Sequence, residues 1–446
     1  MKKTLLCLTV LVLFGASSAL ASIITNPNQS ALYFRLLARN ASTDLDAVYY
    51  NPAGLTKLAD GFHFAIHNQT IFQEKTVVNE FPLLNDDTYV GKVNVPIFPT
   101  AFVVFKTGPL ALSFGFGPNA GGGSAQFDHG LPSFEIPFSL IPLGVTALGV
   151  PTTSYSLDMS FEGTSIYYGF QGNISYAFND MISVGGGVRY ILAKNTYKGY
   201  IRNVMINPLF PPLGLLGQMV PASTFFAAVG QAGLAALTAD KEVDVEQTGS
   251  AITPILSVNV TPLEALNISL KYEFNTNLEL QNKTTIDDTG LYPDGAKERN
   301  DIPAILSLGA SYALAPQLRA YLSGNMYFDR SANWEGRENL VDSNTFDVAA
   351  GMEFDLFSAV TLSAGILRTQ FSLSEEFQTD FSHEMANTSL GFGARLRMIP
   401  KVDIDLGVLY ILYGTAERTY SGLLGPYTES YKRSTLGFAV GFAYHL

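Results

Sequence analysis

Much of this chain alternates large apolar residues with small or polar ones for ten or more residues at a time. Near the C-terminus, large apolar side chains occupy every second position from Leu436 to Tyr444, with glycine and alanine between them. A period of two is that of a β-strand, whose successive side chains point to opposite faces. One face of each strand is therefore oily and the other small or polar, so the strands need apolar solvent on one side and water on the other.

About fourteen such segments occur, centred near residues 68, 102, 113, 170, 190, 252, 272, 308, 322, 350, 366, 392, 409 and 438. An even number is typical of single-chain bacterial barrels, as are short turns at one end and long loops at the other. Short links such as Asn179-Asp180 and Ala315-Pro316 alternate with long ones. We predict an all-β fold, a 14-stranded antiparallel transmembrane β-barrel over residues 61–446, with long extracellular loops at 119–158 and 203–240.

The composition favours a membrane barrel over the alternatives. A soluble β-sandwich would turn its apolar face inward, but only 15% of the residues are charged, against about 25% in an ordinary soluble protein. Glycine and proline interrupt every apolar run of the length that a membrane helix needs. The net charge of −12 argues against a nucleic-acid partner. Cys7 is the only cysteine, which excludes disulfides and cysteine-based metal sites.

Residues 1–21 have the features of a signal peptide. Lys2 and Lys3 precede an apolar run, and Ala19-Leu20-Ala21 forms a cleavage pattern before Ser22. Residues 22–60 then show no alternation. Because fourteen strands enclose more space than their inward side chains fill, we predict that this segment is a small N-terminal helical hatch that plugs the lumen. The alternative is a disordered periplasmic tail.

The run from Ala38 to Leu55 resembles the N-terminal signature of the FadL-type family of outer-membrane transporters for hydrophobic compounds. The family's hallmark is an Asn-Pro-Ala triplet just before the first strand, which Asn51, Pro52 and Ala53 match. The resemblance implies a monomeric, hatch-plugged barrel in the outer membrane of a Gram-negative bacterium. It also implies passive uptake of long-chain fatty acids or related hydrophobic compounds, which leave sideways into membrane lipid where the third strand is kinked.

The third strand contains residues that favour such a kink. Gly115, Gly117 and Pro118 lie within the stretch that starts at Leu112. Proline donates no hydrogen bond to a β-ladder, and glycine permits a bend or bulge. We therefore predict that these residues form the lateral exit. The alternative is an ordinary strand end that runs into a loop.

The two long loops are more apolar than those of a water-filled pore. Residues 203–239 contain no charged side chain. We predict that both loops form a flexible apolar surface that captures the ligand. The alternative is that they bury one another and cap the barrel. The capture residues are Phe134, Ile136, Phe138 and Leu140 in the first loop and Leu215, Met219, Phe225 and Phe226 in the second.

A carboxylate headgroup would need a cation inside the barrel. The alternation places Arg189, Lys271 and Arg395 on inward faces, so these are the candidate headgroup ligands. The alternative is that they pair with neighbouring acidic residues of the lumen, such as Glu273 and Asp405.

Three other functions are alternatives for such a chain: a general porin, an adhesin and an outer-membrane hydrolase. The five histidines form no recognisable catalytic constellation, and no nucleotide-binding motif occurs. We therefore expect a protein that is not an enzyme and that uses no cofactor and no metal. The sequence does not distinguish fatty acids from alkanes or aromatic hydrocarbons as the ligand.

Overall fold

The computed structural model describes residues 30–446. The predicted signal peptide and the first residues of the predicted hatch lie outside this range. The barrel wall is a closed antiparallel sheet of fourteen strands, as predicted, in which each strand pairs with the next and the last pairs with the first. The strands are β1 (Gly61–Asn79), β2 (Thr88–Thr107), β3 (Leu110–Phe127), β4 (Tyr155–Ala177), β5 (Ile182–Ile206), β9 (Lys241–Leu263), β10 (Leu266–Glu273), β13 (Ile305–Ala315), β14 (Leu318–Tyr327), β15 (Phe346–Phe357), β16 (Val360–Gln370), β17 (Asn387–Ile399), β18 (Val402–Tyr413) and β20 (Gly425–His445).

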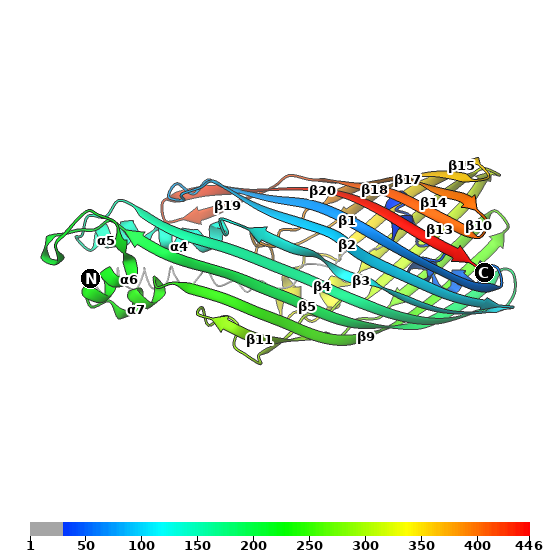
Figure 1. The fold of residues 1–446 in the computed structure, drawn as a ribbon, viewed down its shortest axis with the longest axis horizontal. Helices are drawn as coiled ribbons and strands as arrows, with labels where there is room; N and C mark the ends of the chain where they lie inside the picture. Colours follow the sequence, from blue (N-terminus) through cyan, green and yellow to red (C-terminus); the bar gives the residue numbers. More distant parts are fainter. Residues whose placement is uncertain (1–29) are drawn as a thin grey trace.

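Short elements extend one end of the barrel. The segment between β3 and β4 spans residues 128–154, shorter than the predicted loop because both strands run further toward it. Figure 1 shows helices at this end, beyond the long strands β4, β5 and β9, while the C-terminus lies at the other end. The elements are α4 (Pro132–Ser139), α5 (Ile141–Ala147), α6 (Ala222–Ala228), α7 (Ala232–Leu237), η2 (Pro211–Leu213), η3 (Asp329–Ser331) and η4 (Arg337–Leu340), with strands β6 (Leu209–Phe210), β7 (Leu215–Leu216), β8 (Val220–Pro221), β11 (Glu279–Asp287), β12 (Lys297–Arg299) and β19 (Ala416–Gly422).

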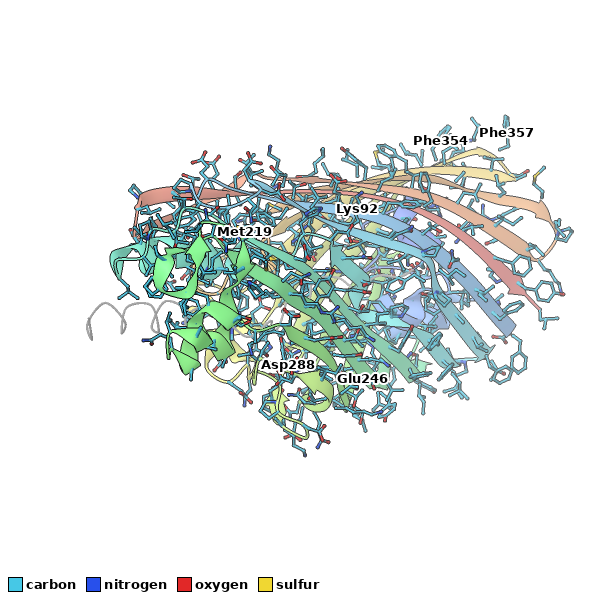
Figure 2. All side chains as sticks on the ribbon, turned by 60° about the vertical axis from the view of Figure 1, so that its left-hand side comes forward. Lys92, Met219, Glu246, Asp288, Phe354 and Phe357 are labelled. Carbon is cyan, nitrogen blue, oxygen red and sulfur yellow. The ribbon has the colours of Figure 1, made fainter. Side chains whose placement is uncertain are left out.

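The apolar faces of the strands point out of the barrel. On β9, Ile252 and Leu256 are 60% and 56% exposed, whereas Thr253 and Ser257 are buried toward the lumen. Figure 2 shows the same arrangement at the end of β15, where Phe357 points away from the wall. This orientation is the one that a barrel in hydrocarbon requires. Within residues 30–446, no helix is both long and apolar enough to span a membrane.

The apolar belt ends part-way along the longest strands. On β5 and β9, the outward positions beyond Leu192 and Ile252 carry ion pairs between neighbouring strands. Figure 2 labels one of the acidic partners, Glu246. Charged pairs that face outward belong in water, so the helix-bearing end of the barrel projects beyond the bilayer. The pairs are Lys194–Glu246 at 2.5 Å, Lys198–Asp244 at 3.1 Å and Arg202–Glu242 at 2.5 Å.

The small inward faces of the strands make room for the hatch. The described part of the hatch, residues 30–60, contains α2 (Ala31–Arg35), α3 (Ala47–Tyr50) and the 3-10 helix η1 (Pro52–Lys57). A Cβ atom at Gly391 would lie 2.6 Å from the backbone oxygen of Phe34, and one at Gly407 2.6 Å from the Phe34 Cβ. Glycine on the wall therefore lets the hatch backbone approach closely.

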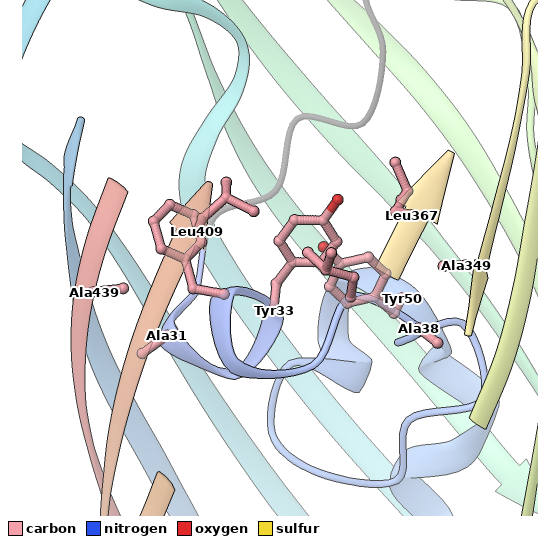
Figure 3. Packing of buried hydrophobic residues seen from close by; sticks show 10 residues of the cluster. Ala31, Tyr33, Ala38, Tyr50, Ala349, Leu367, Leu409 and Ala439 are labelled. Carbon is pink, nitrogen blue, oxygen red and sulfur yellow. The ribbon is translucent and has the colours of Figure 1, made fainter. Parts of the chain in front are cut away.

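An apolar cluster joins the hatch to the wall. Tyr33 of α2 stacks on Tyr50 of α3, with ring centroids 6.1 Å apart. Figure 3 shows these two rings between Leu409 of β18 and Leu367 of β16. The hatch is thus packed into the lumen like a small core, and the segment is ordered, in contrast to the tail that was the alternative.

The position of the outward apolar belt predicts how arginine substitutions change the free energy of unfolding. Leu256→Arg places a charge in the belt and should destabilise the barrel by about 2–4 kcal/mol, whereas Thr248→Arg, near the ion pairs, should cost about 0–1 kcal/mol. Reversible denaturant unfolding in lipid vesicles measures both. Equal free energies of unfolding for the two variants would contradict the assignment of the belt.

Candidate ligand passage

The Asn51 side chain joins the hatch to the wall and also joins two segments of the hatch. Its Nδ2 donates to Oδ1 of Asn259 on β9 at 2.8 Å and to the backbone oxygen of Ser42 at 3.0 Å. Asn51 is fully buried. A buried asparagine that bridges two segments fixes their relative position, because its own amide group would be an unpaired polar group if the segments moved apart.

The next two residues of the triplet are held by serines of three strands. Ser175 of β4 donates to the backbone oxygen of Pro52 at 2.7 Å, and Ser183 of β5 donates to that of Ala53 at 2.9 Å. The Ala53 N–H donates to Oγ of Ser257 on β9 at 2.9 Å. The Asn-Pro-Ala triplet is therefore the point where the hatch is bonded to β4, β5 and β9.

Buried ion pairs fasten the opposite side of the hatch. Arg35 of α2 lies 2.6 Å from Glu353 and 2.9 Å from Asp405. Arg395 pairs with Asp405 at 2.9 Å and with Asp44 of the hatch at 2.9 Å. Breaking a buried pair by removing one partner is strongly destabilising, so these contacts resist displacement of the hatch.

The other two headgroup candidates share one carboxylate. Arg189 lies 2.6 Å from Glu273, and Lys271 lies 2.5 Å from it. Both cations also lie over the Tyr49 ring of the hatch, at 4.5 and 4.7 Å from its centroid. Arg189 donates two further hydrogen bonds to Gln171 Oε1. All three candidates are thus ion-paired, and a role in headgroup binding stays a prediction.

The wall has a gap between β2 and β3. The two strands pair from Thr107↔Leu110 to Ala101↔Phe116 and again from Val93↔Ala125 onward, but residues 94–100 of β2 are not paired with residues 117–124 of β3. Of the predicted exit residues, Gly115 still pairs with β2, whereas Gly117 and Pro118 lie at the edge of the gap.

Prolines on both strands explain the gap. Pro96 and Pro99 of β2 and Pro118 of β3 have no N–H to donate to the ladder. On its other side β3 stays paired with β4, with bulges at Asn119 and residue 122. The β2 prolines are not among the predicted exit residues, although two prolines within one strand pattern are themselves a signal for an interrupted ladder.

A small cavity of about 30 Å³ lies between the gap and the hatch. A Cβ at Gly115 would lie 2.9 Å from Cγ1 of Val48, so hatch and wall are in close contact here. The hatch therefore covers the gap from inside the barrel. The cavity is lined by Val48, Tyr49 and Tyr50 of the hatch, Thr100 and Phe102 of β2, Gly115, Phe116, Gly117, Pro118 and Asn119 of β3, and Gly169, Gln171 and Arg189 of β4 and β5.

The two predicted capture loops pack against each other. Phe138 and Ile141 of the first loop share a buried cluster with Phe225, Phe226 and Leu234 of the second. Leu140 is buried, while Phe134, Ile136 and Leu215 are partly buried.

The second loop keeps an exposed apolar tip. Met219, labelled in Figure 2, is 40% exposed and Leu216 is 74% exposed. Leu209 and Leu213 are exposed beside them. The two loops, called the cap from here on, therefore bury part of their apolar side chains against each other and expose the rest.

The contacts of Asn51 lead to a prediction about leakage. Asn51→Ala removes the bonds to Asn259 and Ser42, so the hatch should loosen and the ion conductance of the barrel in a planar bilayer should rise. Asn207→Ala, in the second loop, removes the acceptor of the Thr153 and Ser154 amides and should leave the conductance unchanged. A conductance of the Asn51 variant equal to that of the wild type would count against the anchoring role.

Comparison with known proteins identifies the fold. No family model and no curated protein sequence matches the chain. A Pseudomonas aeruginosa FadL homologue has 14% identity and a TM-score of 0.68, with 95% of this chain and 100% of that one covered. The Pseudomonas putida toluene transporter TodX has 12% identity, a TM-score of 0.59 and coverages of 91% and 95%. The Ralstonia pickettii toluene transporter TbuX has 14% identity, a TM-score of 0.56 and coverages of 90% and 94%. The chain therefore has the fold of the FadL homologue and of these toluene transporters.

Proposed function

We propose that this protein is a monomeric outer-membrane transporter for the passive uptake of hydrophobic compounds, such as long-chain fatty acids or hydrocarbons. The observation that carries the proposal is the gap between β2 and β3, which lies beside a cavity at the hatch. A wall that must pair every backbone group in lipid has no structural use for such an interruption. The interruption has a use if it is an opening toward lipid that the hatch closes from inside.

Capture takes place at the cap. The exposed tip of the second loop, with Leu216 and Met219, offers apolar surface to a ligand in water. Burial of one methylene is worth ~0.8 kcal/mol, so a chain of about fourteen gains on the order of 11 kcal/mol before association costs. Such a gain drives capture without an energy source.

Release occurs sideways through the gap. Outside it, Ile97 of β2 is 73% exposed and Phe114 of β3 is 48% exposed, so the opening faces the apolar belt. A ligand that leaves there enters lipid without crossing water. The route opens when the hatch moves so that Val48 no longer contacts β3. Two proteins of the same fold are toluene transporters, which supports a hydrophobic cargo.

The contact at Gly115 provides the test. Gly115→Val puts a branched side chain where a Cβ already meets Val48 and Phe102, at 2.9 and 3.3 Å. The larger side chain narrows the passage and adds a steric cost of about 1–3 kcal/mol to the barrier that the ligand crosses. The uptake of radiolabelled oleate or toluene by cells should therefore slow about tenfold or more. The barrel itself should remain folded.

Gly172→Val is the matched control for this test. A Cβ at Gly172, on the neighbouring strand β4, meets no atom within 4 Å, so uptake should match that of the wild type. Uptake by the Gly115 variant equal to that of the control would reject the lateral exit. Mass spectrometry of lipid co-purified with the wild-type protein would identify the cargo.

A further inference from the structure

We propose that the cavity behind the β2–β3 gap is a subsite for an uncharged hydroxyl group of the ligand, formed by Tyr50, Thr100 and Asn119. The inference rests on the proposed transport function and deepens it, because it names the chemical class of cargo that the passage selects. That class is hydrophobic molecules with a hydroxyl group, such as phenols or long-chain alcohols.

Three polar groups of the cavity lining have unused hydrogen-bonding capacity. Tyr50, Thr100 and Asn119 are 4%, 2% and 4% exposed. Within the described part of the chain, no group forms a hydrogen bond with Tyr50 Oη, Thr100 Oγ1 or Asn119 Oδ1. Buried polar atoms are nearly always paired, so unpaired atoms on three residues that line one cavity indicate that a ligand group completes them.

Two other polar side chains of the lining, Gln171 and Arg189, are paired, which sets them apart from these three groups. Gln171 donates to the backbone oxygen of Val48 at 2.7 Å and accepts from Arg189. Arg189 uses its Nε, Nη1 and Nη2 on Gln171 and Glu273, and Tyr49 covers its face. A carboxylate ligand would have to displace Glu273 to reach this guanidinium.

A hydroxyl group matches the unpaired atoms. The Asn119 Oδ1 is an acceptor and needs a donor, whereas the Tyr50 and Thr100 hydroxyls can donate or accept. A ligand hydroxyl donates to Asn119 and accepts from Thr100 or Tyr50. A ketone or ester oxygen supplies no donor for Asn119, and a hydrocarbon supplies neither.

The size of the site also fits a small group. About 30 Å³ accommodates a hydroxyl but not an aromatic ring or an alkyl chain. The apolar part of the ligand then lies in the gap, beside Phe116 and Pro118. Gly117 keeps the site accessible, because a Cβ there would lie 2.9 Å from the Thr100 Oγ1.

A pair of isosteric probes tests the proposal. p-Cresol and p-xylene differ only in a hydroxyl group that replaces a methyl group. Equilibrium dialysis of the radiolabelled probes against the full-length protein in lipid nanodiscs, with empty nanodiscs subtracted, gives both affinities. The variant is Thr100→Val with Asn119→Leu, which keeps the number and branching of the side-chain heavy atoms and removes the polar atoms. Thr369→Val, a buried position on β16 outside the cavity, is the control.

We expect the wild type and the control to prefer p-cresol, and this preference to fall about tenfold or more in the double variant. The p-xylene affinity should be retained, which also shows that the variant is folded. If the double variant does not fold, Tyr50→Phe serves for the same comparison and should lower the preference in the same direction.

The other outcomes separate the two proposals. Saturable binding of both probes with an equal preference in wild type and variants overturns the hydroxyl subsite, assigns the polar atoms to bound water and leaves the transport proposal standing. A wild type that prefers p-xylene has the same consequence. Absence of saturable binding of either probe, together with no uptake of oleate or toluene by cells, overturns both proposals.

Discussion

Backbone hydrogen bonding in hydrocarbon is the constraint on which this structure depends. A strand in lipid must pair on both sides, since no water is present to pair with an N–H or C=O group. The closed sheet meets this requirement between most neighbours but not between residues 94–100 of β2 and 117–124 of β3. Proline there removes donors that would otherwise be unpaired, and the hatch closes the wall from inside. The weakest part of the wall is thus supported by the segment that fills the lumen.

The lumen is held together by polar contacts that cross from one wall to the other. Arg35, Asp44 and Arg395 connect the hatch to β15, β17 and β18, while the Asn-Pro-Ala triplet connects it to β4, β5 and β9. Few such polar contacts are made to β2 and β3, where the hatch packs mainly through apolar side chains. Leu45, Val48 and Leu55 of the hatch share a buried cluster with Phe102 and Val104 of β2 and Ala111 of β3. Most of the polar anchors of the hatch therefore lie on other strands, whereas the hatch meets β2 and β3 mainly through apolar packing.

The local pattern of the sequence predicts the wall well and the cavity poorly. Alternation is a property of neighbouring residues, so the strands and their outward faces follow directly from it. Gly117 and Pro118 also indicate the gap, because proline lacks an N–H for the ladder and glycine permits a bend, and both effects are local to the strand. The meeting of Thr100, Asn119 and Tyr50 depends on strand register and on the fold of the hatch, and no local pattern encodes it. The pairs Lys271–Glu273 and Arg395–Asp405 join residues 2 and 10 apart and match the alternative stated from the sequence. The pairs Arg189–Glu273, 84 residues apart, and Arg395–Asp44, 351 apart, depend instead on strand register and on the fold of the hatch.

The pairing of β20 with β1 has a consequence for biogenesis. These strands join residues nearly the whole length of the described chain apart, such as Phe64 and Tyr444. The sheet can close only after both of its end strands are available, so every earlier intermediate carries two free edges and a row of apolar side chains. Such species aggregate readily in an aqueous compartment. Protection of the open sheet until it closes is therefore a demand made by the topology itself.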